Sequence, residues 1–148
     1  MKASTPSRII TVSSTAHRYG RINRTDLNME NSYNQYQAYF QSKLANVLFA
    51  RSLASRLSGT SVTSNSLHPG IVHLKILISP LTLFMKTPKS GAQTSIMLAV
   101  DPALEQVSGQ YFADCRITNE SGAARDDEMA EWLWEASEYM VHKDNALY

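Results

Sequence analysis

Tyr39 and Lys43 stand four residues apart in a stretch that contains neither Gly nor Pro. On a helix, this spacing places two side chains one turn apart on the same face. A free phenol titrates near 10, and a neighbouring ammonium lowers the phenol pKa because it stabilises the phenolate. The pair is therefore a candidate for proton transfer. The alternative is an exposed helix pair with no chemical role, because Tyr-x-x-x-Lys is weak evidence by itself.

Two small polar segments follow candidate strands. Ser14 follows the β-branched run at residues 8–13, and Pro69-Gly70 closely follows a second run at residues 62–67. The first run does not alternate, which is typical of a strand buried on both faces in a parallel sheet. Ligands of open α/β sheets bind outside the carboxyl ends of the strands. We therefore expect Ser14, Tyr39 and Pro69-Gly70 to meet at one rim, where the Ser14 hydroxyl hydrogen-bonds a substrate carbonyl.

The elements that must position these side chains alternate along the chain. Strands are expected at residues 8–13, 62–67 and 109–113, and helices at residues 33–58, 88–100 and 125–140. Thr87 caps the second helix and Pro88 occupies its first position. In the last helix, carboxylates form a solvated face opposite an apolar one. This order predicts an α/β fold with a three-stranded parallel sheet and right-handed crossovers, in one domain that covers residues 1–148.

Composition restricts the class of protein further. The chain has 148 residues, of which 43% are hydrophobic and 18% charged, so we expect a folded domain with a real core. The formal net charge of +1 argues against general nucleic-acid binding. Cys115, the single cysteine, cannot form an internal disulfide and is compatible with a reducing, intracellular compartment. The spacing of the histidines and of Cys115 predicts no metal site. Residues 71–85 are apolar but too short to span a bilayer.

Five ordered motifs together resemble the C-terminal half of a short-chain dehydrogenase/reductase of the retinol dehydrogenase-like group. They are SRIITVSSTAH at residues 7–17, YFQSKLAN at 39–46, HPGIV at 68–72, KTP with GAQT at 86–94, and SGQYF at 108–112. The resemblance covers nearly the whole chain. It implies one half of a Rossmann-like, doubly wound parallel sheet, about three strands with flanking helices, without the N-terminal nucleotide-binding half.

The resemblance also implies roles for individual residues in an NAD(P)-dependent oxidoreductase that interconverts an alcohol and a carbonyl. Ser14 would orient the substrate oxygen, and Tyr39 would be the general acid/base. Lys43 would lower the Tyr39 pKa and bind the nicotinamide ribose. Pro69-Gly70 and the backbone of Val72 would border the nicotinamide of NADP or NAD, next to Tyr39 and Lys43.

The apolar residues 76–85 would form the substrate loop, which suits a retinoid or another lipophilic alcohol. Core packing or membrane contact is the alternative for this loop. The helix at residues 33–58 resembles the dimer helix of the family, so we expect a homodimer or a partner chain there.

Two features depart from the family pattern. No two of the six glycines are close enough to form a phosphate-binding loop, and Leu74 stands where the family often has Thr. We therefore expect these 148 residues alone to bind NAD(P)H poorly and to be marginally stable, with a bare sheet edge at residues 8–13. The alternative function is that of a truncated, catalytically inactive relative that acts as a dimerising or protein-interaction module.

Overall fold

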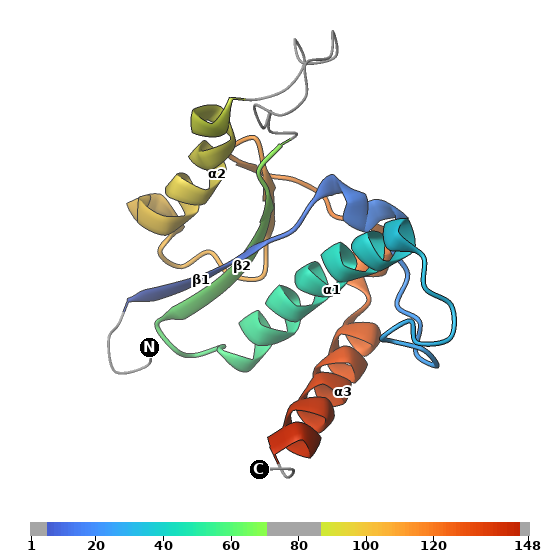
Figure 1. The fold of residues 1–148 in the computed structure, drawn as a ribbon. Helices are drawn as coiled ribbons and strands as arrows, with labels where there is room; N and C mark the ends of the chain where they lie inside the picture. Colours follow the sequence, from blue (N-terminus) through green and yellow to red (C-terminus); the bar gives the residue numbers. More distant parts are fainter. Residues whose placement is uncertain (1–5, 71–86, 146–148) are drawn as a thin grey trace, which may run out of the picture.

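A four-stranded sheet in the order β1 (Ser7–Val12), β2 (Val62–His68), β3 (Tyr111–Ala113) and β4 (Arg116–Ile117) forms the centre of the fold. It is seen in a computed structural model that describes residues 6–70 and 87–145 (Figure 1). β1 and β2 are parallel, with Val12 opposite Leu67, and β2 and β3 are parallel, with Leu67 opposite Phe112. The carboxyl ends of β1 and β2 therefore meet at one edge of the sheet.

Helices cover both faces of this sheet (Figure 1). α1 (Gln35–Arg56) lies on one face with α3 (Asp127–Asn145) packed beside it, and α2 (Pro88–Val100) lies on the other. Three 3-10 helices complete the described elements: η1 (Thr15–Tyr19), η3 (Pro102–Leu104) and η4 (Gly122–Arg125).

The two faces of the sheet have separate cores, because consecutive residues of a strand point to opposite faces. Tyr111 of β3 points toward α1 and α3, and the next residue, Phe112, points toward α2. The first core contains Leu44, Val47, Leu48, Tyr111, Ala124, Ala130 and Leu133. The second core contains Leu67, Leu98 and Phe112. The short β3 thus joins both layers to the sheet.

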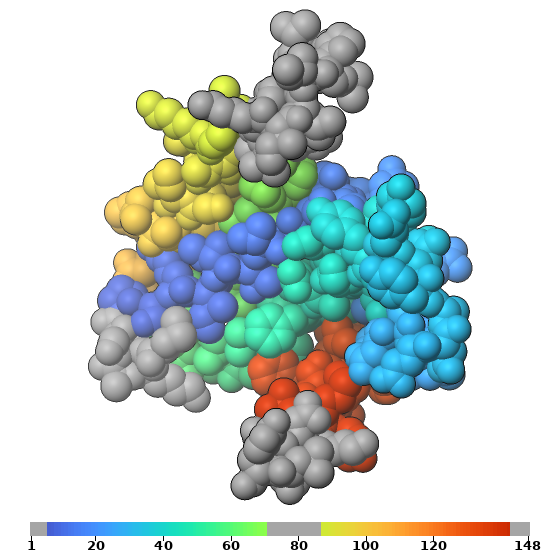
Figure 2. All heavy atoms as spheres, viewed as in Figure 1, coloured from blue at the N-terminus to red at the C-terminus, as the bar shows by residue number. Residues whose placement is uncertain are grey.

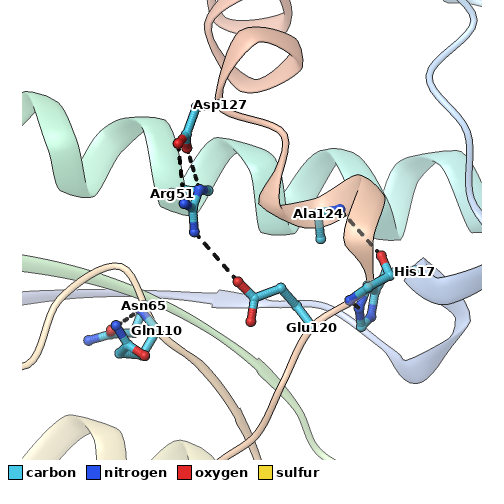
Figure 3. A network of polar contacts seen from close by, with 8 residues as sticks. His17, Arg51, Asn65, Gln110, Glu120, Ala124 and Asp127 are labelled. Carbon is cyan, nitrogen blue, oxygen red and sulfur yellow. Dashed lines mark hydrogen bonds and ion pairs between the residues drawn. The ribbon is translucent and has the colours of Figure 1, made fainter.

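β2 is buried although its sequence is polar, and its side chains hold neighbouring segments in place. The Ser64 hydroxyl donates to the backbone oxygen of Ala50 in α1 at 3.0 Å. The Asn65 amide nitrogen donates to the backbone oxygen of Val107 at 2.6 Å. The Asn65 amide oxygen accepts from the backbone N–H of Gln110 at 2.9 Å (Figure 3). A buried polar group costs stability unless it is hydrogen-bonded, so these contacts explain how the strand tolerates its composition.

The three helices and three parallel strands expected from the sequence are confirmed, with small shifts at their ends. The Thr87 hydroxyl accepts from the backbone N–H of Ser90 and caps α2, as predicted. Asn34 caps α1 in the same way, accepting from the backbone N–H groups of Tyr36 and Gln37. The last helix continues further than predicted, to Asn145.

The prediction that residues 8–13 are buried on both faces is wrong. Residues 7–11 of β1 are half-buried and Val12 is exposed. β1 pairs with β2 on one side and forms an outer edge of the described sheet, and its atoms lie at the surface between α1 and α2 (Figure 2). Among the described residues, no strand pairs with the outer side of β1, as expected from the sequence.

β4 is an addition that the sequence analysis did not predict. It is antiparallel to β3, with Phe112 opposite Ile117. The connection uses Asp114 and Cys115, which have φ values of 51° and 57°. Two consecutive positive φ values suit a tight hairpin turn, for which Asn-Gly is the usual signal. Asp-Cys lacks that signal, which is why the hairpin was missed.

Candidate active site

Tyr39 and Lys43 lie side by side on α1. The Lys43 Nζ is 5.7 Å from the centre of the Tyr39 ring. Tyr39 is 47% exposed, so its hydroxyl is on a side chain that a ligand can reach. The helical spacing of this pair, predicted from the sequence, is therefore realised in the fold.

Two hydrogen bonds join this part of α1 to the end of β1. The hydroxyl of Ser13, which is 3% exposed, donates to the backbone oxygen of Lys43 at 2.7 Å. The side-chain amide of Asn46 donates to the backbone oxygen of Val12 at 3.0 Å. The turn of α1 that carries Lys43 is thus held at the carboxyl end of β1. The sequence analysis did not assign a role to Ser13 or Asn46.

Ser14 follows Ser13 directly and is the N-cap residue of η1, which packs on α1. Its side-chain oxygen accepts a hydrogen bond from the backbone N–H of Ala16 at 3.2 Å. A serine hydroxyl has one donor and two acceptor sites, so accepting this bond does not use the hydroxyl proton of Ser14. Ser14 is half-buried, at the same end of the sheet as the Tyr39–Lys43 pair.

Pro69 and Gly70 follow β2 at the same edge. The backbone N–H of Ser13 donates to the backbone oxygen of Leu67 at 2.6 Å, which ties the two strand ends together. Gly70 has a φ of 92°, a conformation that L side chains rarely adopt. The backbone conformation at Gly70 therefore favours a residue without a side chain. Val72, Leu74 and the apolar residues 76–85 lie outside the described residues.

His17 is a buried polar residue near this site that the sequence analysis considered only as a metal ligand. It is 0% exposed, and both of its ring nitrogens have hydrogen-bond partners, the backbone oxygen of Ser14 and the backbone N–H of Ser121. In the sequence, only its position three residues after Ser14 could have indicated a role for His17 near the site, because its other partner, Ser121, is far away in sequence.

A separate ionic network joins α1 to the start of α3 (Figure 3). The Arg51 guanidinium lies 2.5 Å from a carboxylate oxygen of Asp127 and 3.5 Å from one of Glu120. The hydrogen bond to Asp127 raises the pKa of Arg51, and the same contact lowers the pKa of Asp127. The network fixes the C-terminal segment against the helix that carries Tyr39 and Lys43.

Within residues 6–70 and 87–145, His, Cys, Asp and Glu side chains form no group of three or more that could hold a metal ion. In the same part of the chain, no helix combines the length and apolar character needed to cross a membrane.

The parallel sheet, with helices on both faces and polar side chains at its carboxyl edge, defines a Rossmann-like α/β protein. Known proteins share this arrangement. Human (Homo sapiens) retinol dehydrogenase 14 is 51% identical over 154 residues, which cover 95% of this chain and 46% of that protein. Dehydrogenase/reductase SDR family member 13 of Bos taurus is 44% identical over 151 residues, which cover 93% of this chain and 40% of that protein. No protein-family model matches the sequence.

The crystal structure of an uncharacterised protein of Mycobacterium paratuberculosis has the same fold, with a TM-score of 0.71 at 33% identity. That similarity covers 90% of this chain and 49% of the other. The chain belongs to the short-chain dehydrogenase/reductase family, and its fold corresponds to the C-terminal half of the family's Rossmann-like sheet. The chain spans about half the length of the relatives it matches.

Proposed function

We propose that the protein which contains this chain is an NAD(P)-dependent oxidoreductase that interconverts an alcohol and a carbonyl, with Tyr39 as general acid/base. The observation that carries the proposal is the placement of Tyr39 and Lys43 on one helix face, which Ser13 and Asn46 hold at the carboxyl end of β1. Membership of a family whose named members include retinol dehydrogenases supports the same chemistry.

Each side chain has a distinct task in this proposal. The Tyr39 hydroxyl gives a proton to a carbonyl oxygen or takes one from an alcohol. Lys43 places a positive charge beside the phenol that loses the proton. Ser14 donates its hydroxyl proton to the substrate oxygen, because the bond that caps η1 uses only an acceptor site of the hydroxyl. Such positioned acid/base catalysis contributes about 10² to 10⁴ in rate.

The cofactor in this proposal is NADP or NAD, which supplies or accepts a hydride when it is bound. Gly70 is half-buried and has no Cβ, so a planar ring can approach its backbone closely. Pro69 and Gly70 would border the nicotinamide, together with Val72, and Lys43 would donate hydrogen bonds to the ribose. The prediction that the 148 residues alone bind the cofactor poorly stays a prediction.

The substrate we propose is a lipophilic alcohol or its carbonyl counterpart, of the size of a retinoid. Two observations support this class: the names of the retinol dehydrogenase relatives and the apolar sequence of residues 76–85. No feature of the described residues favours the alternative of an inactive interaction module.

The test compares Tyr39→Phe with wild type in the native polypeptide that contains these residues, with NADPH or NADH and retinaldehyde as the probe. We expect turnover to fall by at least about 10²-fold, because the proton donor is lost. Tyr139→Phe is the matched control, since Tyr139 also precedes a lysine by four residues but lies on α3, and should keep wild-type turnover. Unchanged turnover in Tyr39→Phe would exclude Tyr39 as the acid/base. A native polypeptide that dimerises but neither binds NAD(P)H nor turns over would establish the interaction module instead.

We also propose that α1 contacts a second copy of the chain through the surface that α3 leaves uncovered. Tyr36, near the start of α1, is 64% exposed, and a contact between two copies there would remove its ring from water. Sedimentation equilibrium measures the assembly directly. A dimer that Tyr36→Glu dissociates is the expected result, and a monomer at all concentrations would contradict it.

A further inference from the structure

The ring of His17 connects two segments that are far apart in the sequence. Its Nδ1 lies 2.6 Å from the backbone oxygen of Ser14, and its Nε2 lies 3.1 Å from the backbone nitrogen of Ser121. A backbone N–H can only donate, so Nε2 must accept and carries no proton. The ring is therefore neutral with its proton on Nδ1, from which it donates to Ser14.

The surroundings of His17 hold the ring in this orientation. The ring packs on Tyr111 of β3, with the centroids 4.8 Å apart and the planes tilted by 59°. Ser121 caps η4 through its own side chain, which accepts from the backbone N–H of Ala124. Figure 3 shows His17 beside the turn that carries Glu120 and Ala124. The partner of Nε2 thus belongs to a segment that is itself fixed.

The Ser14 backbone oxygen accepts from His17 twice. The second donor is the backbone N–H of His17, at 3.1 Å. Because the backbone oxygen and the side chain of Ser14 branch from the same residue, rotation of that peptide would displace the hydroxyl. Ser13, on the other side, is tied to Lys43. The position of the Ser14 hydroxyl relative to Lys43 therefore depends on two contacts, the one between His17 and the Ser14 backbone oxygen and the one between Ser13 and Lys43.

We propose that His17 is a positioning residue, which holds the Ser14 hydroxyl in its reactive place by bridging the Ser14 backbone oxygen to the backbone N–H of Ser121. This inference rests on the proposed function, in which Ser14 orients the substrate oxygen. His17 itself is completely buried and touches neither substrate nor cofactor in this proposal.

The experiment is a double-mutant cycle on turnover of retinaldehyde by the native polypeptide. His17→Phe keeps a ring of similar size against Tyr111 but removes both hydrogen bonds. We expect kcat to fall about tenfold, since small displacements of an orienting group cost rate, while the KM for the cofactor stays unchanged. In a Ser14→Ala background the same substitution should cause no further loss of kcat, because the hydroxyl that His17 positions is gone.

A second pair of variants tests the bridge from its far end, without changing the histidine. Ser121→Pro removes the backbone N–H that donates a hydrogen bond to Nε2 of His17. The φ of −70° at Ser121 suits proline. Ser121→Ala is its matched control, because it loses the same capping hydroxyl and keeps the N–H. We expect Ser121→Pro to lower kcat more than Ser121→Ala does. Tyr111→Phe, which removes only a buried hydroxyl without a hydrogen-bond partner among the described residues, should keep wild-type kcat.

The outcomes separate this inference from the function on which it rests. Equal losses of kcat from His17→Phe in the wild-type and Ser14→Ala backgrounds would overturn the positioning role, and so would equal kcat in Ser121→Pro and Ser121→Ala. If His17→Phe does not accumulate as folded protein, the Ser121 pair decides alone. Unchanged turnover in both Ser14→Ala and Tyr39→Phe would instead remove the proposed function.

Discussion

The hydroxyl of Ser13 donates a hydrogen bond to the backbone oxygen of Lys43 at 2.7 Å, and this contact joins the end of β1 to the helix that carries Tyr39. Ser13 is buried, so water cannot easily replace the bond. The residue next to Ser13 is Ser14, whose hydroxyl is the proposed orienting group. This buried hydroxyl thus helps to set the distance between the two parts of the candidate site, together with the Asn46 side chain that donates to Val12.

Ser13→Ala should lower both stability and turnover. The loss of one buried hydrogen bond costs about 1 kcal/mol in free energy of unfolding. Ser64→Ala is the matched control, because Ser64 also joins a strand to α1 through a buried hydroxyl, at the backbone oxygen of Ala50. Urea denaturation should show similar losses of stability in both variants, and only Ser13→Ala should also lower kcat. Equal turnover in the two variants would mean that the Ser13 contact is merely structural.

Gly20→Ala should be strongly destabilising. A Cβ at Gly20 would lie 2.4 Å from the backbone oxygen of Phe40 and 2.8 Å from the Cβ of Leu44, so the segment after η1 would have to move away from α1. We expect a loss of about 3 kcal/mol or more, in the range of overpacked core substitutions. Gly122→Ala is the control, since nothing lies within 4 Å of a Cβ built there. Equal thermal unfolding midpoints for Gly20→Ala and Gly122→Ala would contradict the close packing of Gly20.

Burial of His17 predicts a loss of stability in mild acid. Burial lowers the pKa of His17 below its ordinary 6.5; Arg18 lowers it further, whereas the Ser14 hydrogen bond and Glu120 raise it. Below about pH 6.5 the unfolded chain binds a proton that the folded chain, with the Tyr111 ring packed against His17, does not. The free energy of unfolding should therefore decrease between about pH 7.5 and 5.5.

Urea unfolding midpoints at about pH 7.5 and about pH 5.5 measure this pH dependence of stability. It should be weaker in His17→Phe and unchanged in His142→Phe, which alters an exposed histidine of α3. An unchanged dependence in His17→Phe would show that other groups cause it.

The Arg51–Asp127 contact predicts a second loss of stability, at lower pH. The Arg51 hydrogen bond holds the pKa of Asp127 below its usual 3.8. The stabilisation is present above that value and disappears as the pH falls through the lower pKa of the folded state. Asp127 is exposed, so the effect should be small and salt-sensitive.

Denaturant midpoints at about pH 6 and pH 3 should differ less in Asp127→Asn than in wild type. Glu138→Gln, which changes an exposed carboxylate of α3, should leave the difference unaltered. Identical pH dependence in Asp127→Asn and wild type would exclude the ion pair as its source.

Local patterns predicted much of the fold because they depend on neighbours in sequence. The long stretch without Gly or Pro became α1, and Thr87-Pro88 began α2, since capping and helical spacing act within a few residues. The Asp114–Cys115 turn shows the limit of this reasoning. Its backbone is held in place by contacts from elsewhere, including the Cys115 N–H bond to the Thr94 side chain at 3.2 Å.

The sequence alone predicted that Tyr39 and Lys43 share a helix face, because helical spacing is a local property. It also predicted that Ser14 and Pro69-Gly70 follow neighbouring parallel strands, because the helix between two strands acts as a crossover connection. The tertiary structure decided which contacts hold these groups. His17 and Ser121 are separated by 104 residues, and Ser13 and Lys43 by 30. Such pairs meet only when helices and sheet pack together, and the donors and acceptors involved have no pattern in sequence that identifies their partners.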